Sequence, residues 1–247
     1  MVEEYSTLET TGALSVDVAS YSFTESDTPT ARSRRKAQLP AQLFRYCVCK
    51  RALDIVAVIL ASPLLLPLFL MVACMVRFSS PGRVFYSHRR IRQNGAFFSM
   101  WKFRTMCVNS AELLEEHLTK NPEARAEWNR CHKLRHDPRI TPVGAFLRKY
   151  SLDELPQIWN VLSGEMSLVG PRPIVAAEIE KYKDTFGAYC RVKPGLTGLW
   201  QVSGRSLLTY SQRVELDQQY VDSWTLRGDL QILFRTLPSV VSRDGAF

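Results

Sequence analysis

The sequence predicts a mostly helical α/β globular body carried on a broken, re-entrant helix that inserts into a membrane. The first observation is a run of 22 residues without a charged side chain, from Ile55 to Val76, which the pair Ser62-Pro63 interrupts. The second is that Lys and Arg stand on both sides of this run. The third is that short strand-like runs and helical patterns follow from Gly82 onward. We therefore divide the chain into an N-terminal tail, residues 1–44, a membrane hairpin with its flanks, residues 45–81, and a cytosolic body, residues 82–247.

The N-terminal tail differs from the rest of the chain in charge and composition. Residues 1–40 are rich in Ser and Thr and show no hydrophobic periodicity, so we expect this part to be disordered. Residues 1–31 hold six acidic residues and no Lys or Arg, whereas the remaining chain holds all 32 basic residues and 18 of the 24 acidic ones, a net charge of +14. A body this basic is expected to bind anions, which include nucleic acid, an anionic membrane surface and phosphorylated substrates.

The uncharged run is long enough to cross a membrane. At about 1.5 Å per residue, a helix over this run would reach roughly 33 Å. Pro63 and Pro67 lie near its middle, and each proline removes a backbone hydrogen bond and kinks a helix. Because carbonyl groups freed at membrane depth need partners, we expect the Ser62 hydroxyl to bond one of them.

The basic flanks of the run favour a hairpin. Lys and Arg mark the cytoplasmic side of a membrane segment. They occur before the run at Arg45, Lys50 and Arg51, and after it at Arg77, Arg83, Arg89, Arg90 and Arg92. The segment is therefore expected to enter the membrane, break at Ser62-Pro63 and return to the same side; a plain spanning helix and a buried helix of a soluble protein are the alternatives. We expect Asp54 to pair with Lys50 or Arg51, or to cap the start of the helix.

The body is predicted to contain short strands and several helices. Val84–Tyr86 and Phe97–Phe103 have the aromatic and β-branched residues typical of strands. Helices are expected over residues 109–120, where Asn109 and Glu112 have the spacing of a capping box, from Pro122 onward, over 144–150 and over 155–162. Residues 192–205 are predicted to form a Gly-rich loop, and an amphipathic helical pattern over 211–241 is predicted to break at Gly228 and Pro238.

An acidic pair, Asp153-Glu154, is the first candidate for chemistry. It lies in the stretch Ser151-Leu-Asp-Glu-Leu-Pro-Gln157. Ser151 and Glu154 have the spacing of a capping box, which is a structural explanation for both residues. If Ser151 caps the helix, Pro156 falls where its N–H is needed; if Asp153 caps it, Pro156 costs nothing. In either case Asp153 is expected at the positive end of a helix, where a phosphate group is also favoured.

Basic residues near the acidic pair indicate a site for phosphoryl chemistry. Lys102 and Arg104 stand in one motif, Arg148 lies just before the acidic pair, and Arg172 follows it in Gly-Pro-Arg-Pro. Two adjacent carboxylates with Lys and Arg nearby suit a phosphoryl site that holds Mg²⁺. The alternative is that these cations form a solvated face or a face toward lipid headgroups. The glycines at 195, 198 and 204 are turn-formers or part of a phosphate loop.

The motifs from residue 45 to residue 247 resemble those of the bacterial sugar transferases, monotopic enzymes that move hexose 1-phosphate onto polyprenyl phosphate in exopolysaccharide and O-antigen synthesis. The residues that carry the resemblance are Lys50-Arg51-x-x-Asp54 with Ser62-Pro63, Lys102–Met106, Asp137–Thr141, Ser151–Gln157, Gly164–Pro173, Lys193–Gly198 and Asp244–Phe247. The resemblance implies a re-entrant membrane helix broken at Ser62-Pro63 and a catalytic body on the cytoplasmic face of the bacterial inner membrane.

The resemblance also implies roles for individual residues. Asp153 matches the family nucleophile and Mg²⁺ neighbour, and Glu154 matches its dyad partner. The basic positions near the substrate phosphates are Lys102, Arg148 and Arg172, and we count Arg104 with them; Asp217 and Asp229 match two supporting acids. The implied partners are a UDP-sugar donor, with galactose or glucose expected, and undecaprenyl phosphate as acceptor.

Two other functions remain open from the sequence. One is a basic, membrane-anchored protein that recruits nucleic acid or an enzyme, although no nucleic-acid-binding module is visible and we expect none to be bound. The other is a nucleotide-sugar pyrophosphatase, which would release sugar phosphate to water. The sequence leaves open the transferred sugar and the oligomeric state, a homo-oligomer included.

Overall fold

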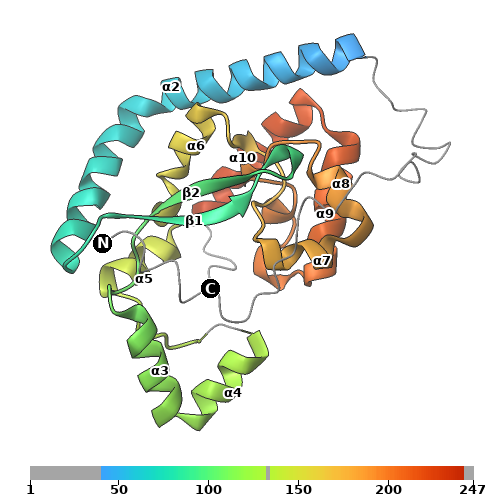
Figure 1. Cartoon of the computed structure of the whole chain (residues 1–247). Coiled ribbons are helices and arrows are strands. Elements are labelled where there is room, and N and C mark those ends of the chain that lie inside the picture. The colour runs from blue at the N-terminus through green and yellow to red at the C-terminus, as the bar shows by residue number, and fades with distance from the viewer. Residues whose placement is uncertain (1–39, 132–133, 242–247) are drawn as a thin grey trace.

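The computed structural model describes residues 40–131 and 134–241 (Figure 1). The predicted N-terminal tail, residues 1–44, lies outside these residues as far as residue 39, whereas residues 40–44 belong to the helix α2 (Pro40–Ser79), so the predicted boundary at 44 was wrong. The chain is mostly helical with a few short strands, and one long apolar helix lies along its edge (Figure 1). The predicted mostly helical body with short strands and one long apolar helix is confirmed.

Helix α2 runs from Pro40 to Ser79 and is long and apolar enough, over Tyr46–Ser79, to cross a membrane. Figure 1 shows that it changes direction partway, and Pro63 and Pro67 are the two prolines inside it. The missing N–H of Pro63 would have bonded the carbonyl of Ile59, because helical bonds join residues four apart. The Ser62 hydroxyl donates to that carbonyl at 2.7 Å, as the sequence predicted.

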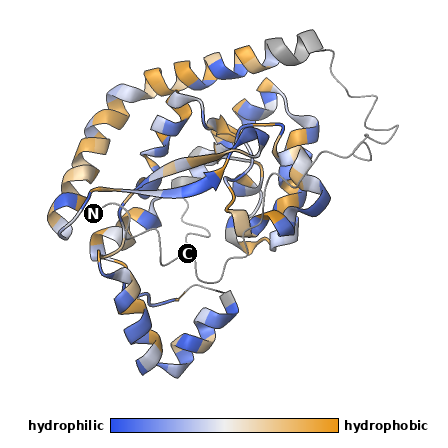
Figure 2. Cartoon of the chain, viewed as in Figure 1, coloured by the Kyte–Doolittle hydropathy of each residue, from blue (hydrophilic) through white to orange (hydrophobic). Residues whose placement is uncertain are grey.

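The outer face of α2 is apolar and exposed. Val56, Leu60 and Leu64 are 53%, 76% and 75% exposed, and Figure 2 shows the helix as the most continuous hydrophobic element of the chain. The opposite face docks on the body through Val58, which packs near its middle, and through Val72 and Val76, which are buried toward its end. The exposed apolar face excludes the buried helix of a soluble protein among the alternatives.

Three polar residues fix the first half of α2 to the body. Lys50 pairs with Asp229 at 2.7 Å, and Arg51 donates to the carbonyls of Val161 and Leu162 at the end of helix α6 (Gln157–Ser163). Asp54 accepts hydrogen bonds from the Ser167 hydroxyl at 3.1 Å and the Leu168 N–H at 3.0 Å. The expectation that Asp54 pairs with Lys50 or Arg51, or caps the helix, was wrong, because Asp54 lies well inside α2 and both cations bond elsewhere.

The hairpin of β1 (Phe85–Ile91) and β2 (Phe97–Phe103) follows α2. The two strands are antiparallel, with Phe85 opposite Phe103 and Ile91 opposite Phe97. The predicted second strand is confirmed, whereas the first extends beyond Tyr86. The polar residues 88–90 hide the strand in the sequence, because the strand is largely exposed and forms through pairing with β2.

The predicted helices of the body are present in the predicted order, with differences at their ends, and two short helices between residues 179 and 189 were not predicted. The structure has α3 (Ser110–Lys120), α4 (Pro122–Cys131), α5 (Pro142–Lys149), α6 (Gln157–Ser163), α7 (Ile179–Tyr182), α8 (Phe186–Tyr189), α9 (Tyr210–Ser223) and α10 (Leu226–Val241). The capping box at Asn109 was wrong, because its side chain makes no cap bond. The breaks at Gly228 and Pro238 were also wrong: both lie inside α10, whose first turn is capped by the Thr225 hydroxyl at 3.0 Å from the Gly228 N–H.

A second small sheet has one of its two strands inside the predicted Gly-rich loop, residues 192–205. Strand β3 (Ser167–Val169) pairs in parallel with β4 (Gly195–Thr197). The backbones approach so closely here that a Cβ on Gly195 would lie 2.1 Å from the Gly170 nitrogen, and one on Gly198 would lie 2.2 Å from the Gly170 carbonyl oxygen. These glycines therefore bring the loop after β3 against the loop around β4, which is a packing role.

Candidate active site

The acidic pair lies between helices α5 and α6. Ser151 adopts a left-handed conformation with φ 54°, residues 152–154 form the 3-10 turn η4 (Leu152–Glu154), and Pro156 takes the N-cap position of α6. Both capping interpretations were wrong, because the Ser151 side chain makes no cap bond and α6 begins after Asp153. Pro156 costs nothing at this position, since its N–H would be unsatisfied in any helix.

Lys102 of strand β2 joins the two carboxylates. Its Nζ lies 2.7 Å from Glu154 Oε1 and 3.4 Å from Asp153 Oδ2. Asp153 is 7% exposed as a residue, whereas the Glu154 side chain is 37% exposed. We call Asp153 and Glu154 the carboxylate dyad.

The surroundings of the dyad shift the pKa values of Asp153 and Glu154 in opposite directions. Burial raises the pKa of Asp153, and the neighbouring Glu154 charge adds to this, while Lys102 and Arg148 act in the opposite direction. Burial also acts to raise the pKa of Glu154, but Lys102, Arg172 and Arg90 together hold it below its usual value. The basic carboxylate is therefore Asp153, and Glu154 is the member that stays ionised.

Arg148 and Arg172 reach the dyad electrostatically from two sides. Arg148, at the end of α5, donates from Nε to the Thr105 hydroxyl at 2.9 Å, which fixes its guanidinium. Arg172 is exposed on the loop after β3, with its Cζ 5.6 Å from the centre of the Trp200 ring. Thr105 was missed by the sequence analysis, although it stands in the same motif as Lys102.

Arg104 binds the chain just after α2 instead of the dyad. Its guanidinium donates to the carbonyls of Pro81 at 2.6 Å and Ser80 at 2.8 Å, and to the Ser80 hydroxyl at 2.9 Å. It thereby fixes the chain where it leaves α2, and a Cβ on Gly82 would lie 2.1 Å from Arg104 Nη1. The structure does not bring Arg104 to the dyad.

Asp217 and Asp229 are buried and hold elements of the fold together. Asp217 of α9 accepts from the Tyr182 hydroxyl at 2.7 Å, and burial raises its pKa to about 7. Asp229 of α10 binds Lys50, and it also accepts from the hydroxyls of Tyr46 at 3.0 Å and Tyr220 at 2.9 Å. Neither acid makes a hydrogen bond to the dyad residues; their bonds join α9 to Tyr182, and α10 to α2 and α9.

Asn160 is another residue that the sequence analysis missed. It is fully buried in α6, accepts from the Trp101 N–H at 3.0 Å and donates to the Ser99 carbonyl at 2.8 Å. These bonds join α6 to the strand that carries Lys102. A buried amide between hydrophobic neighbours is the signal in the sequence that could have identified it.

The two carboxylates of the dyad are ligands of the kind that Mg²⁺ prefers. They converge on a single cationic group, the Lys102 ammonium. Mg²⁺ prefers oxygen ligands and is commonly held by one or two carboxylates together with substrate phosphates. Among the described residues, no group of three His, Cys, Asp or Glu side chains forms a ready cation site. The structure thus fits a metal that is bound together with a phosphate substrate.

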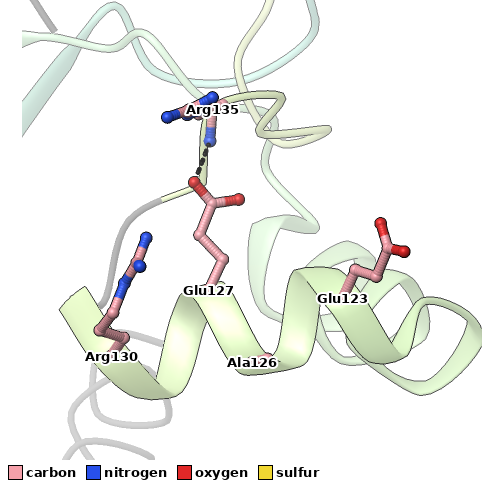
Figure 3. A pocket seen from close by; sticks show the side chains of 5 residues that line it. All are labelled: Glu123, Ala126, Glu127, Arg130 and Arg135. Atoms are coloured by element: carbon pink, nitrogen blue, oxygen red, sulfur yellow. Dashed lines mark hydrogen bonds between the residues drawn. The ribbon is translucent and has the colours of Figure 1, made fainter.

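A hollow on α4 lies away from this site. Figure 3 shows its lining side chains, Glu123, Ala126, Glu127, Arg130 and Arg135, with a hydrogen bond of 3.2 Å from the Arg135 N–H to Glu127 Oε1. Helix α4 lies at the end of the molecule farthest from the first half of α2 (Figure 1). The candidate active site is therefore the dyad and its cations.

The fold and the site define a class, a membrane-associated protein in which a buried Asp153 and a half-exposed Glu154 lie among cations and suit phosphate chemistry. The family model of the bacterial sugar transferases matches residues 45–243, which is most of the chain. The chain therefore belongs to the bacterial sugar transferase family.

Individual relatives agree with this family. A protein of Haemophilus influenzae described as an uncharacterized sugar transferase is 52% identical over 204 residues, which are 81% of this chain and 42% of that protein. The exopolysaccharide production protein ExoY of Rhizobium meliloti is 50% identical over 200 residues, 81% of this chain and 88% of ExoY. The undecaprenyl-phosphate galactose phosphotransferase of Salmonella typhimurium is 51% identical over 202 residues, 80% of this chain and 41% of that protein. The chain spans about two fifths of the Haemophilus and Salmonella proteins and most of ExoY.

Proposed function

We propose that this protein transfers a hexose 1-phosphate from a UDP-sugar to undecaprenyl phosphate, with release of UMP, as the first membrane step of exopolysaccharide or O-antigen synthesis. The observation that carries the proposal is the dyad of Asp153 and Glu154 joined by Lys102, on a body that holds a bent apolar helix. The name of the Salmonella relative supports galactose as the hexose and undecaprenyl phosphate as the acceptor.

Asp153 is the proposed nucleophile of the first step. One of its carboxylate oxygens attacks the β-phosphorus of the UDP-sugar, the bond from that phosphorus to the bridging oxygen breaks, and the oxygen leaves with UMP. The sugar phosphate is then held as an ester of the Asp153 carboxylate. The raised proton affinity of Asp153 favours this role over Glu154, because a more basic carboxylate is a better nucleophile.

The acceptor completes the reaction in a second step. A phosphate oxygen of undecaprenyl phosphate attacks the same phosphorus, the bond to Asp153 breaks, and the free carboxylate is restored with a pyrophosphate linkage in the product. The two steps keep the donor and acceptor anions from occupying the site together, which would cost Coulomb energy in a site of low dielectric. Lys102 and Arg172 would neutralise charge on the transferred phosphoryl group.

Mg²⁺ belongs to the proposal as a cofactor. Asp153 and Glu154 are the residues that would hold it, together with oxygens of the donor diphosphate. When bound, it would withdraw electron density from the phosphoryl oxygens. Glu154 remains charged for this purpose because Lys102, Arg172 and Arg90 stabilise its ionised form.

We propose that α2 enters the inner membrane, turns at Pro63 and Pro67, and returns to the cytoplasmic side. The Lys50–Asp229 pair and the Arg104 bonds to Ser80 and Pro81 support this topology, because they attach both ends of α2 to the same body. The acceptor phosphate would then meet the dyad at headgroup depth. Accessibility of single cysteines placed near residues 50 and 80 tests the topology: labelling from one side is expected, and labelling from opposite sides would mean a spanning helix.

The reaction is tested with purified protein and UDP-hexose labelled in the sugar and its phosphate, first without acceptor. The wild type should release UMP and retain label covalently, whereas Asp153→Asn should do neither. Glu116→Gln, a change in an exposed ion pair on α3, is the matched control and should behave as the wild type. UMP release by Asp153→Asn would end the nucleophile assignment.

The same preparation separates the alternatives once undecaprenyl phosphate is added. Label in the organic phase indicates the transferase, and sugar phosphate in water indicates a pyrophosphatase. A binding protein would produce neither.

A further inference from the structure

A second group of cations lies next to the dyad, around the Trp200 ring. The Cζ atoms of Arg172 and Arg213 lie 5.6 Å and 5.0 Å from the centre of this ring. Trp200 itself is 6% exposed. Arg172 comes from the loop after β3 and Arg213 from α9, so two distant parts of the chain bring guanidinium groups to one indole.

These two guanidinium groups make no close contact with a carboxylate of the described residues. Within the described part of the chain, neither Arg172 nor Arg213 forms an ion pair. The Nε atoms of Arg213 and Arg90 and the Nε1 of Trp200 are buried and have no hydrogen-bond partner among the described residues. Buried donors without partners are costly, and they are expected where a ligand supplies the acceptors.

Arg90 joins this group to the dyad. Its side chain is 15% exposed, its Nη1 lies 3.7 Å from Glu178 Oε2, and burial, together with the Arg172 charge, lowers the pKa of its guanidinium. Arg90 and Arg172 also stabilise the Glu154 carboxylate, so they lie within electrostatic reach of the dyad. Cations thus continue from Lys102 at the dyad through Arg90 and Arg172 to Arg213.

Of the three clustered arginines, only Arg90 forms an ion pair among the described residues. Such a cluster favours an anionic ligand, and planar guanidinium groups suit phosphate oxygens, which they bind in pairs. We infer that Arg213, together with Arg172 over Trp200, binds the phosphate of the departing nucleotide, which is the α-phosphate of the donor. This inference rests on the proposed function, which places the β-phosphorus of the same diphosphate at Asp153. It assigns a binding role to Arg213 and a supporting role to Trp200, which neither the motifs nor the relatives indicated.

Two adjacent phosphates of one donor would then have separate sets of cations. Lys102 would neutralise the transferred phosphoryl group, and Arg172 and Arg213 would neutralise the group that leaves as UMP. Stabilising the leaving anion lowers the barrier to breaking the bridging bond, and it also retains UMP in the site after the first step.

The experiment is a calorimetric titration of the full chain in lipid nanodiscs, with UMP as the probe. It compares the wild type with Arg213→Met, Arg213→Lys and the control variant Arg125→Gln. Arg213→Met keeps an apolar stem against Trp200 and removes the charge. UMP affinity is expected to fall about 10-fold to 100-fold in Arg213→Met, the range for a lost charged hydrogen bond. The UMP affinity of Arg213→Lys should lie between those of Arg213→Met and the wild type. The affinity of Arg125→Gln, whose ion pair with Glu115 is half-exposed, should equal that of the wild type.

UMP affinity within twofold of the wild type in Arg213→Met would overturn the inference, and so would wild-type protein that releases UMP from UDP-hexose without binding it in the titration. Wild-type protein that releases no UMP would instead show that the proposed function has failed. If the melting temperature shows that Arg213→Met does not fold, the UMP affinity of Arg213→Lys decides the question. A lower affinity than that of the wild type supports the inference, because the single ammonium group cannot replace the paired contacts of the guanidinium, and an unchanged affinity overturns it.

Discussion

Lys50 of the apolar helix and Asp229 of the last helix form a buried ion pair of 2.7 Å, although 179 residues separate them in the sequence. Their side chains are 9% and 0% exposed. The hydroxyls of Tyr46 and Tyr220 also donate to Asp229, so the carboxylate is fully bonded. This pair is what positions the start of the membrane helix against the body.

Breaking this pair from one side should destabilise the protein strongly. In Lys50→Met the Asp229 charge stays buried without its partner, which costs about 3–5 kcal/mol. The free energy of unfolding in detergent, followed by denaturant titration, measures this cost. Lys120→Met, which breaks an exposed pair with Glu116, is the control and should have little effect. An equal effect of the two substitutions would show that the buried pair does not hold α2.

Lys102 should control both the rate and its dependence on pH. Lys102 lowers the pKa of Asp153 and of Glu154, so Lys102→Met should raise both values and move the acid limb of the activity profile to higher pH. The rate of UMP release should also fall by roughly 100-fold, because one preorganised cation at the phosphoryl group is lost. The measurement is the initial rate of UMP release between pH 5 and 9.

Lys149→Met, a change in an exposed cation at the end of α5, serves as the control for Lys102→Met. A lower rate with an unmoved acid limb would mean that Lys102 supports the structure without tuning the dyad.

Asp217 should make the stability depend on pH. Burial raises its pKa from 3.8 to about 7. Between about pH 4 and pH 7 the folded state therefore keeps a proton that the unfolded state has lost, and stability decreases as the pH rises through this window. At 1.36 kcal/mol per pKa unit, the loss is at most roughly 4 kcal/mol.

Asp217→Asn should lack this decrease, so its unfolding free energy relative to the wild type should rise between pH 4.5 and pH 8. The same titration on Asp222→Asn, in which an exposed acid is changed, should follow the wild type at both pH values. Parallel curves for Asp217→Asn and the wild type would contradict the burial of a protonated Asp217.

The close approach of the two loops at β3 and β4 should tolerate no side chain at residue 195. A Cβ on Gly195 would lie 2.1 Å from the Gly170 nitrogen, so Gly195→Ala forces backbone movement and should cost about 3 kcal/mol. Gly187→Ala on α8 is the control, since no atom lies within 4 Å of its added Cβ. It should be neutral or stabilising by about 0.5–1 kcal/mol. The melting temperatures of the two variants measure this difference. Similar melting temperatures for Gly195→Ala and Gly187→Ala would contradict the prediction.

Much of the fold was predictable where the signal is local. The uncharged run predicted a long apolar helix, and its prolines and the Ser62 hydroxyl predicted a disturbance in the middle, because each effect acts within a few residues. The structure bends α2 there but keeps it helical through Ser62-Pro63. The ends of helices were less predictable: Ser151 and Asn109 have the residue types of caps, but neither side chain makes a cap bond. Strand β4 was hidden in a loop because its residues form a strand only when β3 lies beside them.

The sequence by itself determined that an apolar helix carries a body with an adjacent pair of carboxylates and an excess of cations. It could not determine which cations meet the pair. Lys102 and Arg104 are two residues apart, and alternation along a strand would direct both to one face. Strand β2 ends at Phe103, however, and Arg104 turns to the carbonyls of Ser80 and Pro81, while Lys102 bonds the dyad. That choice belongs to the tertiary structure, because a long charged side chain goes to whichever partner the packing of distant segments places within its reach.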